Sequence, residues 1–368
     1  MRVVLTGGDG FIAVNLRINL AERAGTQVIP VTRTTSRREL EEAISTADAV
    51  VHLAGVNRPR EGQSYAENGA FTAEVCGAVR RSGRPTPVIL SSSVQAGLDN
   101  AYGASKREAE GHVLALREAG NPVAIFRLPN VFGKWARPGY NSAIATFCHN
   151  AAHGLPLTIH DPAAPLTLAY VDDVVGAFLR CLGGAWPGDG WAEVDPVHHT
   201  TVGEAACLIS SFGSSRESSM PGRVGCGLAR ALYATYLSYV PPKSFSYPLK
   251  RNTDARGSFC EVLRTPDCGQ FSFFTAAPGV TRGGHYHHTK SEKFIVVQGQ
   301  ARFRFKDMRT GAAAEVEARG SDPVVVETVP GWAHDITNTG NTDLVVLLWA
   351  NEVFDRDRPD TFMHAAGK

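Results

Sequence analysis

The stretch RVVLTGGDGFIA, residues 2–13, decides the fold of the first half of the chain. Three apolar residues predict a buried strand, a glycine-rich turn interrupts it, and a helix is expected from Phe11 to about Ala24. Gly7 and Gly10 allow a tight turn and a close approach of the backbone to a pyrophosphate, which the helix N-terminus attracts. The pattern therefore predicts a dinucleotide site that begins with Thr6, Gly7, Gly10, Phe11 and Ile12.

The same strand–helix alternation continues to about residue 180. Strand-like runs at 27–33, 49–55, 87–93 and 123–129 alternate with helical patterns at 37–46, 66–82 and 105–119. This order is typical of an α/β Rossmann-like, doubly wound parallel sheet with helices on both faces.

The end of the second strand bears on the choice of cofactor. An acidic residue there would bind the ribose hydroxyls of NAD, but the sequence reads VTRTTSRRE, residues 31–39. Arg33, with Arg37 or Arg38 as helpers, can pair with a 2′-phosphate, so NADP(H) is the expected cofactor. The alternative for Arg37 and Arg38 is a solvated helix face.

Composition excludes several classes of protein. The chain has 368 residues, enough for two domains, and its net charge of +1 gives no case for nucleic acid or a membrane surface. Apolar runs such as 343–349 are far shorter than a membrane span. Seven cysteines without CxxC spacing predict reduced thiols, and no secretory signal is visible, so a cytoplasmic location is expected.

The texture changes in the second half. The helical pattern weakens after 185, and residues 239–252 are interpreted as a linker. Short β runs follow at 259–265, 271–276, 292–299, 301–307, 323–330 and 343–350. We therefore expect two domains, 1–243 and 244–368, the second an all-β sandwich or barrel.

The stretch RGGHYHHTKSEKFIVVQG, residues 282–299, contains candidate metal ligands. His285 and His287 are two residues apart in a strand and face the same side, whereas His288 faces the other. Glu292 follows a short turn, and His334 lies between two later strands. Three imidazoles and a carboxylate suit a divalent metal such as Zn, Ni, Fe or Mn, with zinc preferred.

Three segments resemble the extended short-chain dehydrogenase/reductase family: HLAG (52–55), ILSSS (89–93) and AYGASK (101–106). The resemblance implies cofactor contacts from Leu53, Ala54 and Gly55, and catalytic roles for Ser93 (Ser92 the fallback), Tyr102 and Lys106. Tyr102 and Lys106 share one helical face, and both are also expected to contact the cofactor. The lysine charge would favour the tyrosinate, so that the phenol can exchange a proton near neutral pH.

Further segments extend this resemblance to about residue 240. FRLPNVFG (126–133) and YVDDVV (170–175) match the family and imply that Asn130, Lys134 and Arg137 face a nucleotide-sugar. Family members that are dehydratases carry Thr-Asp-Glu near the serine, but this chain has Ser93-Val94-Gln95 and lacks the acid for elimination. The short spacing between Ser93 and Tyr102 is interpreted as a reductase-like or epimerase-like variation.

The second half resembles the cupin family, a double-stranded β-helix or jelly roll. Gly279, His285, His287, Glu292 and Gly299 match the spacing of its first motif. Gly331, His334 and Asn338 match the second, although Pro330 is one residue too close to the glycine. The resemblance implies that both histidines of the first motif, Glu292 and His334 hold the metal.

The combination, with LAGVNRP (53–59), resembles the CapF-type bifunctional enzymes of capsular polysaccharide synthesis. The resemblance implies a UDP-linked 4-keto-6-deoxy-N-acetylhexosamine as substrate, 3-epimerisation in the cupin, NADPH-dependent reduction at C4, and a path to UDP-N-acetyl-L-fucosamine. A homodimer is the default expectation. The alternatives are a 4-epimerase that recycles NAD, a reductase whose cupin only binds sugar or dimerises, and a non-enzymatic NADP(H) sensor.

Overall fold

The computed structural model describes residues 1–59, 61–218, 221–248, 251–254, 257–260, 269–352 and 357–366. By its packing the chain divides into two compact units: Met1–Trp135 with Thr167–His199, and Ala136–Leu166 with Thr200–Lys368. The boundary predicted near residue 243 was placed where the character of the sequence changes. The two units are instead defined by which elements pack together, so they do not test that boundary, and it stays a prediction. Within the described residues, no helix combines the length and the apolar character needed to cross a membrane.

Six parallel strands form the main sheet of the first unit, in the order β2-β1-β3-β4-β5-β8. The strands are β1 (Arg2–Thr6), β2 (Gln27–Val31), β3 (Ala49–His52), β4 (Val88–Ser93), β5 (Val123–Leu128) and β8 (Trp191–Ala192). Since β1 pairs with β2 on one side and β3 on the other, the strand order reverses at β1. Ligands of such sheets bind beyond the carboxyl ends of the strands at this reversal.

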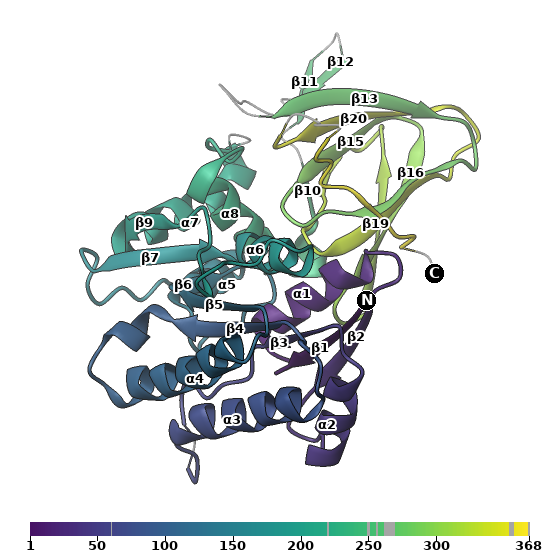
Figure 1. The fold of residues 1–368 in the computed structure, drawn as a ribbon. Helices are drawn as coiled ribbons and strands as arrows, with labels where there is room; N and C mark the ends of the chain where they lie inside the picture. The colour runs from purple at the N-terminus through teal and green to yellow at the C-terminus, as the bar shows by residue number, and fades with distance from the viewer. Residues whose placement is uncertain are drawn as a thin grey trace. The chain divides into compact units, whose positions relative to one another are not determined.

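Helices cover both faces of this sheet, as Figure 1 shows. They are α1 (Phe11–Ala21), α2 (Arg37–Ser45), α3 (Ala66–Arg81), η1 (Val94–Gly97), α4 (Ala101–Glu118) and α6 (Val171–Leu182). Helices α2, α3 and α4 pack on one face, where Val4, Val50 and Val79 are fully buried, and α1 packs beside α6 on the other. The predicted doubly wound α/β fold is confirmed.

A short sheet of β6 (Asn130–Phe132), β7 (Pro165–Tyr170) and β9 (His198–Thr201) completes the N-terminal elements. The weak pattern after residue 185 concealed two helices, α7 (Val202–Ser218) and α8 (Gly227–Leu237), which pack with α5 (Ala143–Ala152) in the second unit. Many serines and glycines in α7 blur its apolar periodicity, so the sequence alone did not predict it.

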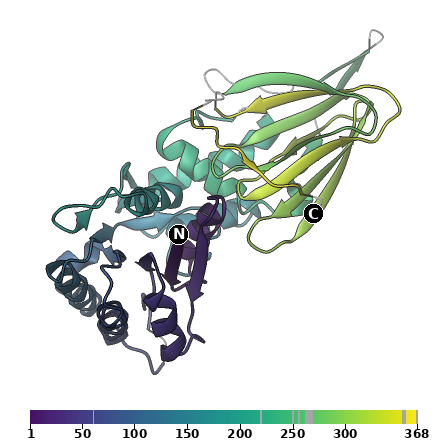
Figure 2. The same cartoon turned by 45° about the vertical axis from the view of Figure 1, so that its right-hand side comes forward.

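Two five-stranded antiparallel sheets make the β part of the second unit, and Figure 2 shows their strands in green to yellow. One has the order β10-β18-β15-β20-β13, with β10 (Ser246–Pro248), β18 (Val324–Glu327), β15 (Glu292–Gln298), β20 (Leu344–Ala350) and β13 (Gln270–Ala276). The other has the order β17-β16-β19-β14-β21, with β17 (Ala313–Arg319), β16 (Gln300–Asp307), β19 (Trp332–Asn338), β14 (Thr281–Tyr286) and β21 (Phe362–Met363). The predicted all-β fold of this part is confirmed, and the two sheets are consistent with a cupin.

The segment interpreted as a linker enters this β part. After η2 (Pro242–Ser244), Phe245 is fully buried against Phe305 and Trp332, and β10 pairs with β18. Prolines suggested a linker, but the aromatic side chain between them belongs to the core. A hairpin of β11 (Arg251–Asp254) and β12 (Gly257–Cys260) follows, and the rest of the strand expected at 259–265 lies outside the described residues.

Candidate functional site

The glycine turn lies where the strand order reverses. Gly7 has a φ of 67°, and a Cβ there would stand 2.9 Å from the backbone of Ala54, so only glycine fits. The Thr6 hydroxyl accepts hydrogen bonds from the amides of Leu53 and Ala54, each at 3.2 Å, which joins the ends of β1 and β3. The residues predicted around Thr6 and Leu53 therefore meet at one edge of the sheet.

Helix α1 begins directly after this turn. Gly10 occupies its N-cap position, and no side chain caps the helix, so its first amides remain available to an anion. Phe11 and Ile12, the first residues of the helix, are half-buried. Gly55 follows β3 at the same edge of the sheet. A Cβ at this position would lie 3.4 Å from the Lys106 ammonium, so the glycine keeps the space beside that ammonium free. Glycines at both places leave room for a dinucleotide.

The arginines after β2 differ in their partners. Arg37 pairs with Glu41 and Glu74, and Arg38 pairs with Glu42 on its own helix. Arg33 is exposed, and within the described ranges no ion pair occupies its guanidinium. The solvated-face interpretation therefore suits Arg37 and Arg38, and Arg33 is the arginine of the three for which the described residues offer no ion-pair partner.

Ser93, Tyr102 and Lys106 converge at the carboxyl end of β4 and the start of α4. The Lys106 ammonium lies 5.7 Å from the centre of the Tyr102 ring and donates to the Ser91 carbonyl at 3.1 Å. Burial lowers the pKa of Lys106 to about 8, against the charge of Glu110, which raises it. The site thus contains a lysine that is still charged at neutral pH.

The phenol of Tyr102 holds its proton at neutral pH. Burial raises the pKa of Tyr102 above its ordinary value, and a hydrogen bond with Ser93 only partly opposes this shift. Burial, rather than the expected stabilisation of the tyrosinate by Lys106, is therefore the dominant effect on the Tyr102 pKa. A protonated phenol beside a lysine is suited to give a proton to a ketone during reduction.

Ser92, the fallback, is committed elsewhere. Its buried hydroxyl donates to Glu110 at 2.6 Å, and Glu110 also holds the Arg127 guanidinium at 2.7 Å. Ser93 is half-buried and accepts a hydrogen bond from the Gln95 amide at 3.2 Å. Of the two serines, Ser93 is the one that a substrate can reach.

Sequence reasoning assigned no role to Asn57, which contacts the predicted acid. The Tyr102 hydroxyl donates to Asn57 Oδ1 at 3.1 Å, and the Tyr65 ring lies 5.4 Å from the Tyr102 ring, centre to centre. Asn57 lies in LAGVNRP, a stretch already distinctive in the sequence, but no spacing rule connects it to a tyrosine 45 residues later.

The three predicted sugar contacts fare differently. Asn130 is exposed at the start of β6. Lys134 is fully buried, and its ammonium contacts both oxygens of Asp172 at 2.6 and 2.8 Å. This burial argues against the predicted sugar contact of Lys134, because a ligand can reach it only after the ion pair opens. Arg137 lies in the second unit, with its guanidinium 5.6 Å from the Tyr140 ring centre.

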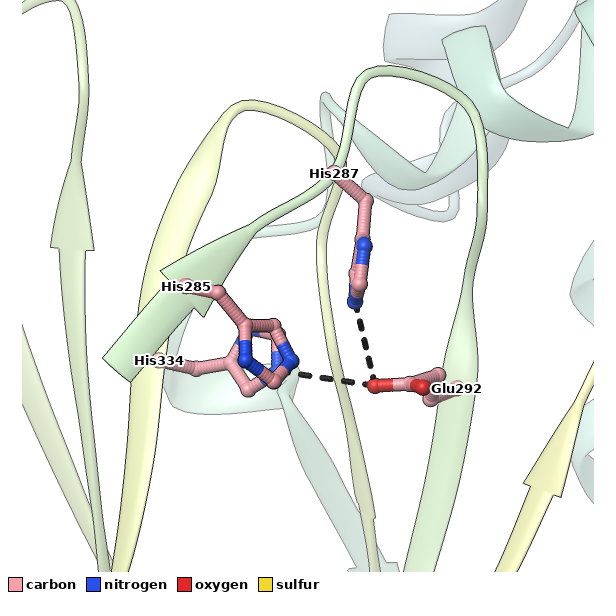
Figure 3. A group of neighbouring side chains, drawn as sticks. All are labelled: His285, His287, Glu292 and His334. Atoms are coloured by element: carbon pink, nitrogen blue, oxygen red, sulfur yellow. Dashed lines mark hydrogen bonds and ion pairs between the residues drawn. The ribbon is translucent and has the colours of Figure 1, made fainter. Parts of the chain in front are cut away.

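The four predicted metal ligands form one cluster inside the β part. His285, His287, Glu292 and His334 each offer a donor atom, and these atoms all lie within 4.8 Å of one another (Figure 3). His285 and His334 are opposite each other on β14 and β19, whereas Glu292 opens β15 in the other sheet. Gly283 and Gly284, both at positive φ, form a bulge that turns His285 toward the cluster.

The electrostatics of the cluster fit a divalent cation. Burial lowers the pKa of His285 to about 3 and also lowers that of His334, so both rings are neutral and can act as ligands. Both ring nitrogens of buried His334 have no hydrogen-bond partner among the described residues, although Nε2 is 3.5 Å from a Glu292 oxygen. A bound cation would give His334 Nε2 and the Glu292 carboxylate a common partner.

The side chains considered as a base near this cluster are all engaged. Both oxygens of Asp335 contact Arg304, at 2.9 and 3.1 Å. Lys290 donates to the Thr361 hydroxyl at 3.1 Å and lies 3.5 Å from Glu292. Tyr286 and His288 are buried beside Phe362, and His288 lies in the loop after β14 and is not one of the four clustered residues. The geometry singles out none of the four.

Family models match both halves of the chain. Residues 3–185 match the NAD dependent epimerase/dehydratase family, and residues 252–362 match the polysaccharide biosynthesis C-terminal domain. The chain is 52% identical, over the full length of both proteins, to the UDP-2-acetamido-2,6-beta-L-arabino-hexul-4-ose reductase of Pseudomonas aeruginosa.

The chain is also similar to solved structures. The capsular polysaccharide assembling protein CapF of Staphylococcus aureus is 40% identical, with a TM-score of 0.69 over 99% of this chain and 100% of that one. UDP-N-acetylglucosamine 4-epimerase of Bacillus cereus, at 21% identity and a TM-score of 0.51, covers 58% of this chain and 82% of that one, and shares the fold alone.

Proposed function

The chain belongs to the CapF-type family, and from that membership we propose that it is a bifunctional nucleotide-sugar enzyme. The cupin domain, residues 244–368, would invert C3 of a UDP-2-acetamido-2,6-dideoxy-4-ketohexose, and the domain of residues 1–243 would reduce its C4 ketone. The observation that carries the proposal is the presence in one chain of two built sites, the Ser93–Tyr102–Lys106 group and the four-ligand cluster. The product would then feed the route to UDP-N-acetyl-L-fucosamine.

The reductase site is argued from the groups around Tyr102. Its raised pKa keeps the proton on the phenol at neutral pH, so it can protonate the C4 oxygen as the ketone is reduced. Ser93 orients the carbonyl, and Lys106 supplies the positive charge that stabilises the phenolate left behind. NADPH bound at the glycine turn would supply the hydride, with Arg33 available for its 2′-phosphate.

The epimerase proposal follows from the chemistry of the substrate. A C4 ketone acidifies the neighbouring C3 hydrogen, because the carbanion delocalises into an enolate. A zinc ion held by His285, His287, Glu292 and His334 would act there as a Lewis acid toward the ketone. His285 is less buried than the other three, which supports an approach of the sugar from its side of the cluster.

The rival functions differ in what they require of these residues. A 4-epimerase that recycles NAD has no use for the unpaired Arg33 after β2. A reductase whose cupin only binds sugar or dimerises needs no metal for C3 exchange. A non-enzymatic NADP(H) sensor needs neither Tyr102 nor Lys106. The cytoplasmic location and the homodimer remain predictions from the sequence.

One experiment tests both activities. The protein is incubated with a UDP-linked 4-keto-6-deoxy-N-acetylhexosamine and NADPH in deuterated water, beside the His285→Ala and Tyr102→Phe variants. We expect deuterium at C3 and consumption of NADPH with the wild type. His285→Ala should lose the C3 label, and Tyr102→Phe should keep it while NADPH oxidation falls about 100-fold or more.

The outcomes separate the two proposals. C3 exchange that persists in His285→Ala would remove the epimerase role from the cupin cluster. NADPH consumption at the wild-type rate in Tyr102→Phe would refute the reductase assignment.

A further inference from the structure

The loop from His287 to Glu292 connects two of the proposed metal ligands. Its four intervening residues, 288–291, are between 3% and 8% exposed, so their backbone amides are shielded from water. Buried amides require acceptors, and a loop outside regular pairing must find them in side chains. The position of both ligands therefore depends on what receives these amides.

One carboxylate receives three consecutive amides of this loop. Asp360 Oδ1 accepts from the His288 amide at 2.8 Å, and Oδ2 accepts from the amides of Thr289 at 2.7 Å and Lys290 at 2.6 Å. The Thr289 hydroxyl adds a fourth hydrogen bond to this carboxylate, at 2.9 Å from Oδ2. We propose that Asp360 is a positioning residue that holds the His287–Glu292 loop in a shape ready to bind metal.

The backbone of Asp360 acts on the ligand itself. Its carbonyl accepts a hydrogen bond from His287 Nδ1, which places the ring proton on that nitrogen. The lone pair of Nε2 then points into the cluster, where Nε2 lies 3.2 Å from a Glu292 oxygen. A carbonyl partner on the outer ring nitrogen is the usual way in which proteins fix the tautomer of a ligating histidine.

The surroundings of Asp360 keep it in place. Strand β21 follows immediately and pairs with β14, with Met363 opposite His285 and Phe362 opposite Tyr286. From helix α8, the Arg230 guanidinium contacts the Thr289 hydroxyl. The same guanidinium lies 3.0 Å from the carboxylate of Glu352. The loop is thus held between helix α8 and the C-terminal segment, and Asp360 supplies most of its bonds.

The inference rests on the proposed metal centre, so the test measures metal binding apart from catalysis. Zinc affinity of the metal-free, full-length protein is measured by competition with a chromophoric chelator, for wild type, Asp360→Asn and Asp360→Glu. Asp343→Asn is the matched control, because that carboxylate is exposed. We expect Asp360→Asn to bind zinc about 10- to 100-fold more weakly. Asp360→Glu, which keeps the charge, should lose less, and the control should match wild type.

Two further readouts separate positioning from general damage. The visible spectrum of the cobalt-substituted protein should change in Asp360→Asn and not in the control, because the ligand geometry changes. Hydrogen exchange at the amides of 288–290 in the metal-free protein should accelerate in Asp360→Asn, since their acceptor is weakened.

Each result decides one proposal. If the wild type binds no zinc, the metal centre is refuted. The exchange measurement then tests only whether Asp360 holds the His287–Glu292 loop. The positioning role of Asp360 would be overturned if both Asp360 variants kept the wild-type zinc affinity, cobalt spectrum and amide exchange. If Asp360→Asn does not fold, the affinity of Asp360→Glu relative to wild type provides the same decision.

Discussion

At the scale of single residues, burial decides which of the predicted groups can act. Ser92 and Ser93 are neighbours in the sequence, but Ser92 is locked on buried Glu110 while Ser93 stays accessible. The segment around Lys134 resembles one that contacts the sugar in the family, but the Lys134 ammonium is buried in an ion pair with Asp172. The resemblance to the reductase family identified these candidates, and only the packing around them ranks them.

Burial of the charged Lys106 ammonium lowers the stability of the fold. Folding lowers the pKa of Lys106 to about 8, whereas the unfolded chain keeps the proton to about 10.5. The charged lysine therefore destabilises the fold below pH 8, and this penalty fades between pH 8 and 10.5. We expect Lys106→Met to raise the free energy of unfolding at pH 7 by about 1–3 kcal/mol, measured by urea denaturation, while abolishing NADPH oxidation.

The pH dependence provides the control. The advantage of Lys106→Met over wild type should be full at pH 7 and small near pH 10.5. A variant less stable than wild type at pH 7, or an advantage that grows with pH, would contradict the assigned pKa.

At the scale of elements, a tight joint sets the distance between Ser93 and Tyr102. The 3₁₀ turn η1 follows β4 directly, and α4 begins at Ala101, capped by the Asn100 side chain at the Gly103 amide. Gly103 packs against η1: a Cβ there would stand 2.3 Å from the Gln95 carbonyl oxygen and 2.6 Å from that of Leu98. The short spacing noted in the sequence is thus made possible by one glycine.

Gly103→Ala tests this joint. Both obstructing atoms are backbone, so η1 or the start of α4 must move and the Ser93–Tyr102 geometry must change. We expect kcat/KM for NADPH oxidation to fall about 100-fold, because small misplacements of reacting groups cost that much. Gly111→Ala on the same helix meets nothing within 4 Å and should keep its activity and gain about 0.5–1 kcal/mol of stability. Equal activity of the two variants would contradict the role of Gly103.

At the scale of the whole molecule, a buried charge network ties the second unit together. Glu327 on β18 pairs with Lys293 on β15 and with Arg216 on α7, and Lys293 also donates to the Tyr247 hydroxyl at 3.0 Å. The Glu327 and Lys293 side chains are less than a tenth exposed. The two cations hold the pKa of Glu327 below its ordinary value, although burial acts in the opposite direction.

Glu327→Gln would leave the buried Lys293 ammonium and the half-buried Arg216 guanidinium without a counter-charge. We expect the thermal and urea transitions of the second unit to weaken by about 3–5 kcal/mol, because breaking a buried pair exposes its full desolvation cost. Glu317→Gln, which removes the exposed partner of Arg302, should change stability by at most about 0.5 kcal/mol. A similar effect of the two substitutions would show that the network does not stabilise this unit.

The sequence by itself determined the two fold classes, the glycine turn, the Tyr102–Lys106 pair and the four-residue metal cluster. The glycine turn and the Tyr102–Lys106 pair follow from short-range spacing, because a helix brings residues four apart onto one face. The metal-ligand set includes His334 from a distant segment, and it was identified from the resemblance to the two cupin motifs. The tertiary structure alone decided the rest. Contacts such as Asn57 with Tyr102, Arg216 with Glu327 and Asp360 with the His287–Glu292 loop join residues 45 to 111 positions apart. No periodicity encodes such separations, because the packing of distant elements creates them.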